Sequence, residues 1–184
     1  MGIFATLHNE HVLIQRHLEL LKRASNRVVD NKPVPREFFE NVIAFARMFN
    51  DKHHHYKEEL LLFAYMAQKY EGRLDATLEK LRSQHEMARD HINGVADMLN
   101  AYERGESDPT RQLGLHLSEF IRLMEVHLFS EDMVFFRMAK EMLSEEEQDA
   151  LQKAFTKYEQ KQGENPTVIC TRMLDQCERM LEIA

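Results

Sequence analysis

Two segments of the sequence place a histidine four residues before a glutamate. HHHYKEELLLF contains His54 and Glu58, and HLFSEDMVFF contains His127 and Glu131. Both segments fit the pattern H-x3-E-[E/D]-x3-F, so the second repeats the first beyond the histidine and the glutamate. Residues four apart lie one above the other on a helix face. Each segment is therefore predicted to present one imidazole and one carboxylate together to the interior of a helical fold.

Two further histidines stand on predicted apolar faces. His11 belongs to a stripe of helical spacing that includes Leu7 and Ile14, and His85 follows Leu81 by four residues. The chain thus offers four imidazoles and two carboxylates for one interior site. Two ionised carboxylates in a dry core are costly unless positive charge lies close to them. Two divalent or trivalent metal ions would supply that charge, and mixed nitrogen and oxygen ligands suit iron, and also manganese or zinc.

The rest of the sequence predicts the helices that would position these residues. No stretch alternates strictly between apolar and polar residues, whereas apolar residues recur with helical spacing. Pro33 and Pro35 interrupt this pattern after the first helix, and Gly72 interrupts it after the second. The predicted helices cover residues 3–30, 35–69, 74–104 and 109–142. Short connections make successive helices antiparallel neighbours, so the expected fold is an all-α, up-down-up-down four-helix bundle.

In such a bundle the second and fourth helices run parallel on a diagonal, so their His-Glu pairs can meet at the same depth. After the bundle, Ser144 and Glu147 have the spacing of a capping box, which predicts a fifth helix. That helix is expected to end near Gly163, and Pro166 lies in the first turn of a sixth. We therefore expect two parts, a bundle over 1–143 and a two-helix C-terminal extension over 144–184.

Composition restricts the class of protein. A chain of 184 residues is long enough for one domain with a substantial core. Its formal net charge of -7 argues against nucleic acid as a general partner, because phosphates would be repelled. No apolar run approaches the roughly 20 residues that a membrane span needs, and the N-terminus lacks the features of a signal peptide. Two cysteines, Cys170 and Cys177, are too few for a disulfide framework, and a cytoplasmic protein is expected.

The sequence resembles the hemerythrin-like, HHE cation-binding domain proteins. The resemblance is carried by Glu10 and His11 and by the segments FNDKHHHYKEELLLF, LRSQHEMARDH and VHLFSEDMVFFRMA, which together spread over residues 7–139. It implies a non-heme di-iron centre inside a four-helix bundle, with an oxo or hydroxo group between the two iron ions. Three pairs of residues would then share the ligation: His11 and His54 on one iron, His85 and His127 on the other, and Glu58 and Glu131 as bridges.

Two positions depart from the oxygen-carrying members of that family. Those proteins have a second histidine in the third helix where this chain has Arg89, and an arginine is always protonated and cannot bind a metal. His55 is the best substitute ligand, and water or another exogenous ligand is an equal alternative. The oxygen carriers also place the last carboxylate five residues after its histidine, so Asp132 competes with Glu131 for the bridging role. These departures argue against a role as a dedicated oxygen carrier more than they argue against metal binding.

The other polar residues near these segments are predicted to lie outside the ligand set. His53 is expected to flank the site. Arg89 is expected to form a salt bridge that screens the core carboxylates, to neutralise a bound anion, or to pair at the surface with Glu86 or Asp90. Three more histidines are expected on solvated or mixed faces: His17, His91 and His116.

The resemblance leaves three classes of function open. The first is the binding or sensing of a small ligand, namely oxygen, nitric oxide or peroxide, at a carboxylate-bridged di-metal centre. The second is an enzyme that decomposes peroxide, oxidises ferrous iron or donates iron in repair. The third is an iron-responsive interaction module, in which residues 144–184 contact a partner or a second copy in a homodimer. We favour the first class, and the sequence leaves open whether the protein is an enzyme.

Overall fold

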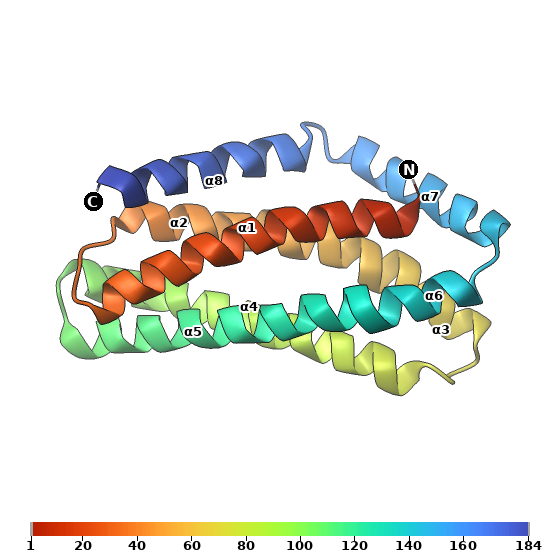
Figure 1. The fold of residues 1–184 in the computed structure, drawn as a ribbon, viewed down its shortest axis with the longest axis horizontal. Coiled ribbons are helices and arrows are strands. Elements are labelled where there is room, and N and C mark those ends of the chain that lie inside the picture. The colour runs from red at the N-terminus through yellow and green to blue at the C-terminus, as the bar shows by residue number, and fades with distance from the viewer. Residues whose placement is uncertain (1, 184) are drawn as a thin grey trace.

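The structure is a computed structural model that describes residues 2–183, and all of its regular elements in that range are helices (Figure 1). Three segments with wider, π-helical turns, labelled η, interrupt two of the long helices. The elements are α1 (Ile3–Val29), α2 (Arg36–Phe45), η1 (Ala46–His55), η2 (Lys57–Phe63), α3 (Ala64–Lys69), α4 (Asp75–Glu103), α5 (Ser107–Ser130), η3 (Glu131–Phe135), α6 (Phe136–Met142), α7 (Glu145–Lys161) and α8 (Pro166–Ile183).

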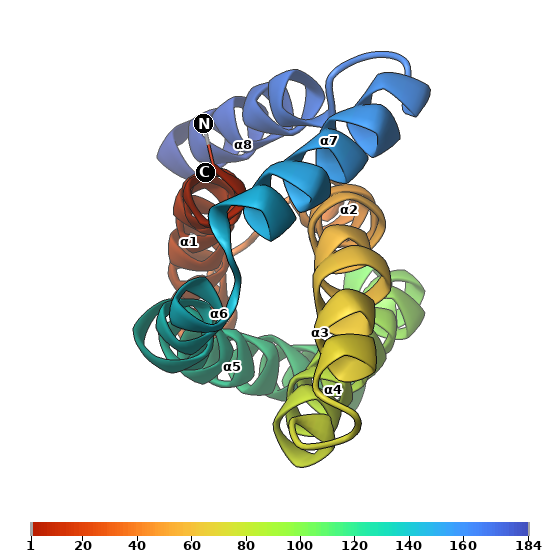
Figure 2. The same ribbon diagram turned by 90° about the vertical axis from the view of Figure 1, so that its right-hand side faces the viewer.

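Four long helices form the bundle that the sequence predicted. The first is α1, the second runs from α2 through η1 and η2 to α3, the third is α4, and the fourth runs from α5 through η3 to α6. Contacts connect α1 to α5, α5 to α4, and α4 to α2, so the second and fourth helices face each other across a diagonal, as the end-on view in Figure 2 shows. The predicted all-α fold is confirmed, and the helices end at the expected breakers, including Gly72, whose φ is +83°.

The two C-terminal helices lie against one side of the bundle (Figures 1 and 2). α8 packs on α1 and α2, and α7 packs on α1 and η2. The predicted capping box at the start of α7 is present: the Ser144 side chain accepts from the Glu147 backbone N–H at 3.2 Å, and the Glu147 side chain accepts from the Ser144 backbone N–H at 2.7 Å. Because Phe155 and Leu174 are fully buried, these helices contribute to the same interior as the bundle.

The interior consists of two apolar clusters with a polar layer between them. On α1, Leu7 belongs to one cluster and Ile14 to the other, and His11 stands between them. The second helix repeats this order, with Phe49 in one cluster, Leu62 in the other and the histidine-rich stretch between them. The bundle thus excludes water on both sides of one polar layer. No helix within residues 2–183 combines the length and the apolar character that crossing a membrane requires.

Candidate metal centre

The polar layer contains seven buried side chains from all four helices of the bundle. Each of them is at most 2% exposed: His11, His54, His55, Glu58, His85, His127 and Glu131. Their nitrogen and oxygen atoms form two groups with the spacing of metal ligands. One group is His11, His54, Glu58 and Glu131, and the other is His55, Glu58, His85 and His127. The glutamate common to both groups, Glu58, lies between the two sites.

In the first group two imidazole nitrogens face each other. Nε2 of His11 lies 3.0 Å from Nε2 of His54. Carboxylate oxygens lie close to both rings: the distance is 3.4 Å from Glu58 to His54 and 3.3 Å from Glu131 to His11. Two nitrogens and two oxygens therefore converge on one point of the polar layer.

The second group repeats this geometry on the other side of the two glutamates. Nε2 of His85 lies 3.0 Å from Nε2 of His127. Glu131 reaches His127 at 3.1 Å, and Glu58 reaches His85 at 3.5 Å. His55 stacks on His85 with 3.7 Å between the ring centroids. Both glutamates thus contact both groups of imidazoles.

The chemistry of this layer fits bound cations. Both carboxylate oxygens of Glu58 and both of Glu131 are buried without a hydrogen-bond partner, and so are both ring nitrogens of His55. Buried polar atoms are normally paired, because leaving them unpaired costs free energy. Burial, and then the negative charge of Glu131, raise the pKa of Glu58 well above its usual value. Burial opposes ionisation of Glu131 too, but His127 and His11 hold its pKa well below the usual value. Two cations would allow both carboxylates to ionise.

Four of the five candidate histidines also make a contact through Nδ1, the ring nitrogen that points away from the centre. Together these four contacts form a closed ring around the bundle. Each Nδ1 lies close to an acceptor on a neighbouring helix: His54 to Glu10 at 2.9 Å, His85 to Glu59 at 2.6 Å, His127 to Gln84 at 3.0 Å, and His11 to Asp132 at 3.1 Å. With the proton on Nδ1, each ring donates outward and keeps the lone pair of Nε2 directed at the centre. Outer partners of this kind fix the tautomer and orientation of metal-binding histidines.

Comparison with known proteins agrees with this donor set. Residues 2–139 match the family described as "Hemerythrin HHE cation binding domain". The chain belongs to the hemerythrin HHE family. No curated protein and no solved structure matches the chain significantly. For an HHE domain, which binds cations, the two His/Glu groups are the candidate metal sites.

Three consecutive histidines of this HHE domain point to three different neighbours. His53 lies 3.0 Å from Oε1 of Gln162, just after α7; His54 faces His11 on α1; and His55 stacks on His85 of α4.

π-Helical turns are rare in proteins as a whole, but they occur often at functional sites. Here they carry four of the candidate ligands: His54, His55, Glu58 and Glu131. Asp132 instead holds the outer nitrogen of His11 and belongs to neither group.

The HHE domain also buries a lysine that sequence reasoning missed. Lys57 has no exposed surface, and its ammonium contacts Glu10, Oε1 of Glu159 at 2.8 Å and Nε2 of His53 at 3.1 Å. Glu10, His53 and Glu159 have the spacing of a third metal site, but the ammonium already supplies the positive charge there. The one feature of the sequence that could have indicated this contact is the spacing of four residues between His53 and Lys57, which places them on the same helix face. Through Glu10, this cluster connects α7 to His54.

Two other expectations are corrected or resolved. His17 was expected on a solvated or mixed face, but it is fully buried, with ring centroids 4.4 Å from Phe45 and 6.0 Å from Phe120. Burial lowers its pKa to about 3. Arg89 pairs with Glu86 at 2.6 Å, as one alternative predicted, and also with Asp51 at 2.6 Å and Glu59 at 2.9 Å. 

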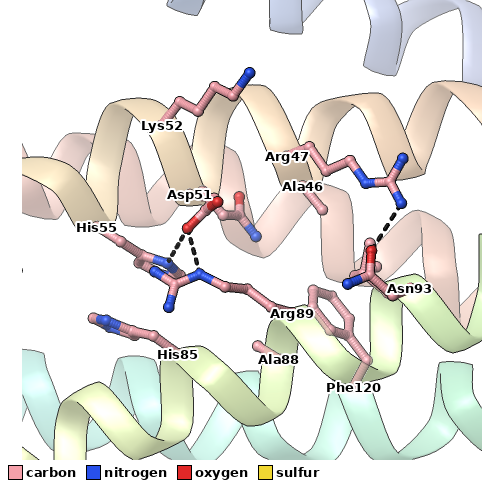
Figure 3. Close-up of a pocket in the computed structure, with 12 residues that line it drawn as sticks. Ala46, Arg47, Asp51, Lys52, His55, His85, Ala88, Arg89, Asn93 and Phe120 are labelled. Carbon is pink, nitrogen blue, oxygen red and sulfur yellow. Dashed lines mark hydrogen bonds and ion pairs between the residues drawn. The ribbon is translucent and has the colours of Figure 1, made fainter.

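A pocket of about 290 Å³ opens beside the second group (Figure 3). It lies between the second helix and α4, with His55 and His85 at one end of its lining and Arg89 beside them. The HHE domain therefore has an opening at one of its two candidate metal sites, next to His55, whose ring nitrogens have no hydrogen-bond partner.

Proposed function

We propose that this HHE protein is a non-heme di-iron protein that binds or senses a small ligand, namely oxygen, nitric oxide or peroxide. The observation that supports this proposal is the set of four unpartnered carboxylate oxygens of Glu58 and Glu131, placed between two facing pairs of imidazole nitrogens. Hydrogen bonding within the protein does not satisfy these oxygens, whereas two cations would. Imidazole and carboxylate ligands without a thiolate suit iron.

In this proposal the seven side chains divide between the two ions. His11 and His54 hold the first ion, His85, His127 and His55 hold the second, and Glu58 and Glu131 bridge them. Two iron ions would supply reversible redox chemistry toward a small ligand. The protein residues would fix the ions in position, and the two apolar clusters would exclude bulk water from both sides of the layer.

The two sites differ in how firmly their ligands are held, and this asymmetry supports the second site as the ligand-binding one. His11 and His54 both have an anionic outer partner, Asp132 and Glu10. At the second site, His85 has the anionic Glu59 at 2.6 Å, but His127 has the neutral side chain of Gln84, and Nδ1 of His55 is 4.0 Å from the nearest oxygen of Asp51. A weakly held His55 can yield its position to solvent or to the small ligand, and the pocket leads to it.

Elemental analysis of anaerobically purified protein tests the metal, and an optical spectrum recorded before and after addition of air or nitric oxide tests the ligand. We expect two iron ions per chain and a spectrum that changes with the ligand. In the variant His55→Ala we expect the first ion to remain and the response to the ligand to change. Protein that holds only zinc and shows no spectral response would contradict the proposal. Steady-state decomposition of hydrogen peroxide or oxidation of ferrous iron would favour the enzymatic alternative.

A further inference from the structure

Two histidines outside the polar layer face each other across the neighbouring helices α4 and α5. Nδ1 of His91, on α4, lies 3.4 Å from Nδ1 of His116, on α5, and the ring centroids are 5.7 Å apart. Both side chains are partly buried, as the mixed faces predicted for them require. Neither residue belongs to the two groups of candidate ligands described above.

The distance between these two nitrogens is long for a hydrogen bond. Hydrogen bonds donated by N–H groups are typically about 2.7–3.2 Å long, so the contact of 3.4 Å between the rings is a weak one. By contrast, two nitrogens that bind a tetrahedral zinc ion at about 2.0–2.1 Å stand about 3.3–3.4 Å apart. The observed separation matches that value, so an ion can bind both nitrogens without a change in the distance between them.

The two nitrogens are also available to an ion. Within residues 2–183, their contact with each other is the one hydrogen bond that either ring makes to the protein. Burial, and then the neighbouring ring of His116, lower the pKa of His91. The His91 ring is therefore neutral at neutral pH, and the neutral imidazole is the form that binds a metal ion.

A glycine on α4 makes room for the ring of His116. A Cβ atom at Gly94 would lie 2.4–2.5 Å from three atoms of that ring, namely Cε1, Nδ1 and Nε2. Any side chain at position 94 would therefore displace the ring from its place beside His91. Glycine inside a helix is less favourable than alanine, so the position of the ring is kept at a cost in helix stability.

An acidic side chain lies close to the pair. Glu119 follows His116 by three residues on the same helix face, and its negative charge acts on His91 in the direction opposite to burial. Its carboxylate now pairs with Arg122 at 2.6 Å, with side chains that are 47% and 67% exposed. Exposed pairs of this kind contribute little to stability, so the carboxylate is free to turn toward an ion.

We propose that His91 and His116 bind a zinc ion through Nδ1 of both rings, with Glu119 and solvent as the remaining ligands. Imidazole and carboxylate ligands in a tetrahedral arrangement suit zinc. The ion would join α4 to α5, the helices that also carry His85 and His127. The site is independent of the proposed di-iron centre, where the facing nitrogens are Nε2 atoms in the interior.

Isothermal titration calorimetry with zinc chloride tests the proposal on the protein as purified, with its resident ions counted by elemental analysis. We expect the parent to bind one zinc ion more than Gly94→Ala, whose new Cβ displaces the His116 ring without removing a ligand atom. Gly114→Ala is the matched control and should bind zinc as the parent does, because a Cβ at this glycine of α5 meets only Cγ1 of Val28, at 3.7 Å.

Variants of the ligands themselves decide the outcome even if Gly94→Ala does not fold. His91→Gln and His116→Gln should each lose the additional zinc ion, and Glu119→Gln should weaken its binding. Equal zinc uptake by the parent and both histidine variants would overturn the proposal and leave the rings joined by a hydrogen bond alone.

The iron content separates this proposal from the proposed function. It should be the same in the parent and in all of these variants. Loss of iron together with zinc in His91→Gln and His116→Gln would place the zinc in the interior and overturn the surface site. A parent that contains no iron but still loses one zinc ion in these variants would contradict only the proposed function.

Discussion

Nδ1 of His54 lies 2.9 Å from a carboxylate oxygen of Glu10, and this pair is one of four that connect neighbouring helices around the bundle. In every pair the acceptor adjoins a candidate ligand in the sequence: Glu10 precedes His11, Glu59 follows Glu58, Gln84 precedes His85 and Asp132 follows Glu131. Each helix therefore supplies ligands and also orients the histidine of the next helix. The geometry of the polar layer depends on the alignment of all four helices.

The pair formed by Glu10 and His54 leads to the first prediction. Glu10→Gln keeps an acceptor near Nδ1 but removes the charge that makes the ring a stronger base. Loss of such an outer partner typically lowers metal affinity about 10- to 100-fold. We expect a fall of that size in competition titrations with a chelator. Glu19→Gln, on an exposed part of the same helix, serves as the control, and equal affinities in the two variants would contradict an orienting role for Glu10.

The second prediction concerns Glu58, which belongs to both ligand groups. Glu58→Gln removes a bridging charge but keeps the shape of the side chain. Metal content should fall to one ion or none. The chelator-treated variant should unfold at the same temperature as the parent or at a higher one, because the amide avoids the cost of a buried carboxylate. Elemental analysis and thermal unfolding measure these effects, with the exposed Glu79→Gln as control. A variant that retains two ions would count against the bridging role.

The third prediction separates the consecutive histidines. His54→Ala should lose metal because it removes a ligand. His53→Ala should retain metal but lower the free energy of unfolding by about 1–3 kcal/mol, since His53 contacts Gln162 and the buried ammonium of Lys57. Metal analysis and denaturant unfolding of both variants provide the measurement. If His53→Ala loses metal and His54→Ala retains it, the histidine assignment in this segment is wrong.

The fourth prediction is a pH dependence caused by His17. The pKa of this ring is lowered to about 3 by burial, whereas an unfolded histidine titrates near 6.5. Between these values the unfolded state binds a proton that the folded state excludes, so the free energy of unfolding decreases as the pH falls through this window. His17→Phe should therefore become increasingly more stable than the parent below about pH 6.5, by up to about 1.4 kcal/mol per pH unit. Denaturant unfolding across this range would refute the assignment if the difference between the two proteins stayed constant.

The fifth prediction contrasts two lysines. Lys57→Met leaves Glu10 and Glu159 without the ammonium that lies between them in the interior, and loss of one partner from a buried ion pair costs about 3–5 kcal/mol. Lys69→Met breaks a partly exposed pair with Glu147 and should cost at most about 1 kcal/mol. Chemical denaturation of both variants measures the difference. Equal losses would show that the Lys57 cluster is not a buried ion-pair network.

Sequence reasoning predicted the features that depend on local signals. Pro33, Pro35 and Gly72 marked helix ends, the Ser144 capping box marked the start of α7, and the repeated His-Glu spacing indicated that both segments face the interior. Those signals arise within one helix, so a single sequence carries them.

Other features depend on how separate helices pack, and the sequence did not predict them. The burial of His17 results from its position between Phe45 and Phe120 on two other helices. The burial of Lys57 results from α7, which brings Glu159 over it. The wider π-helical turns, which carry four candidate ligands, have no recognisable pattern in the sequence. The acceptors of the outer ring were missed as well, although each adjoins a candidate ligand.

The separation of the two apolar clusters has a consequence for biosynthesis. Each half of the bundle has its own hydrocarbon interior, and the candidate ligands stand between the halves and belong to neither. A newly made chain can therefore attain its native topology before any ion arrives. If the polar layer holds ions as proposed, its donors would then take them up in a chain that has already folded.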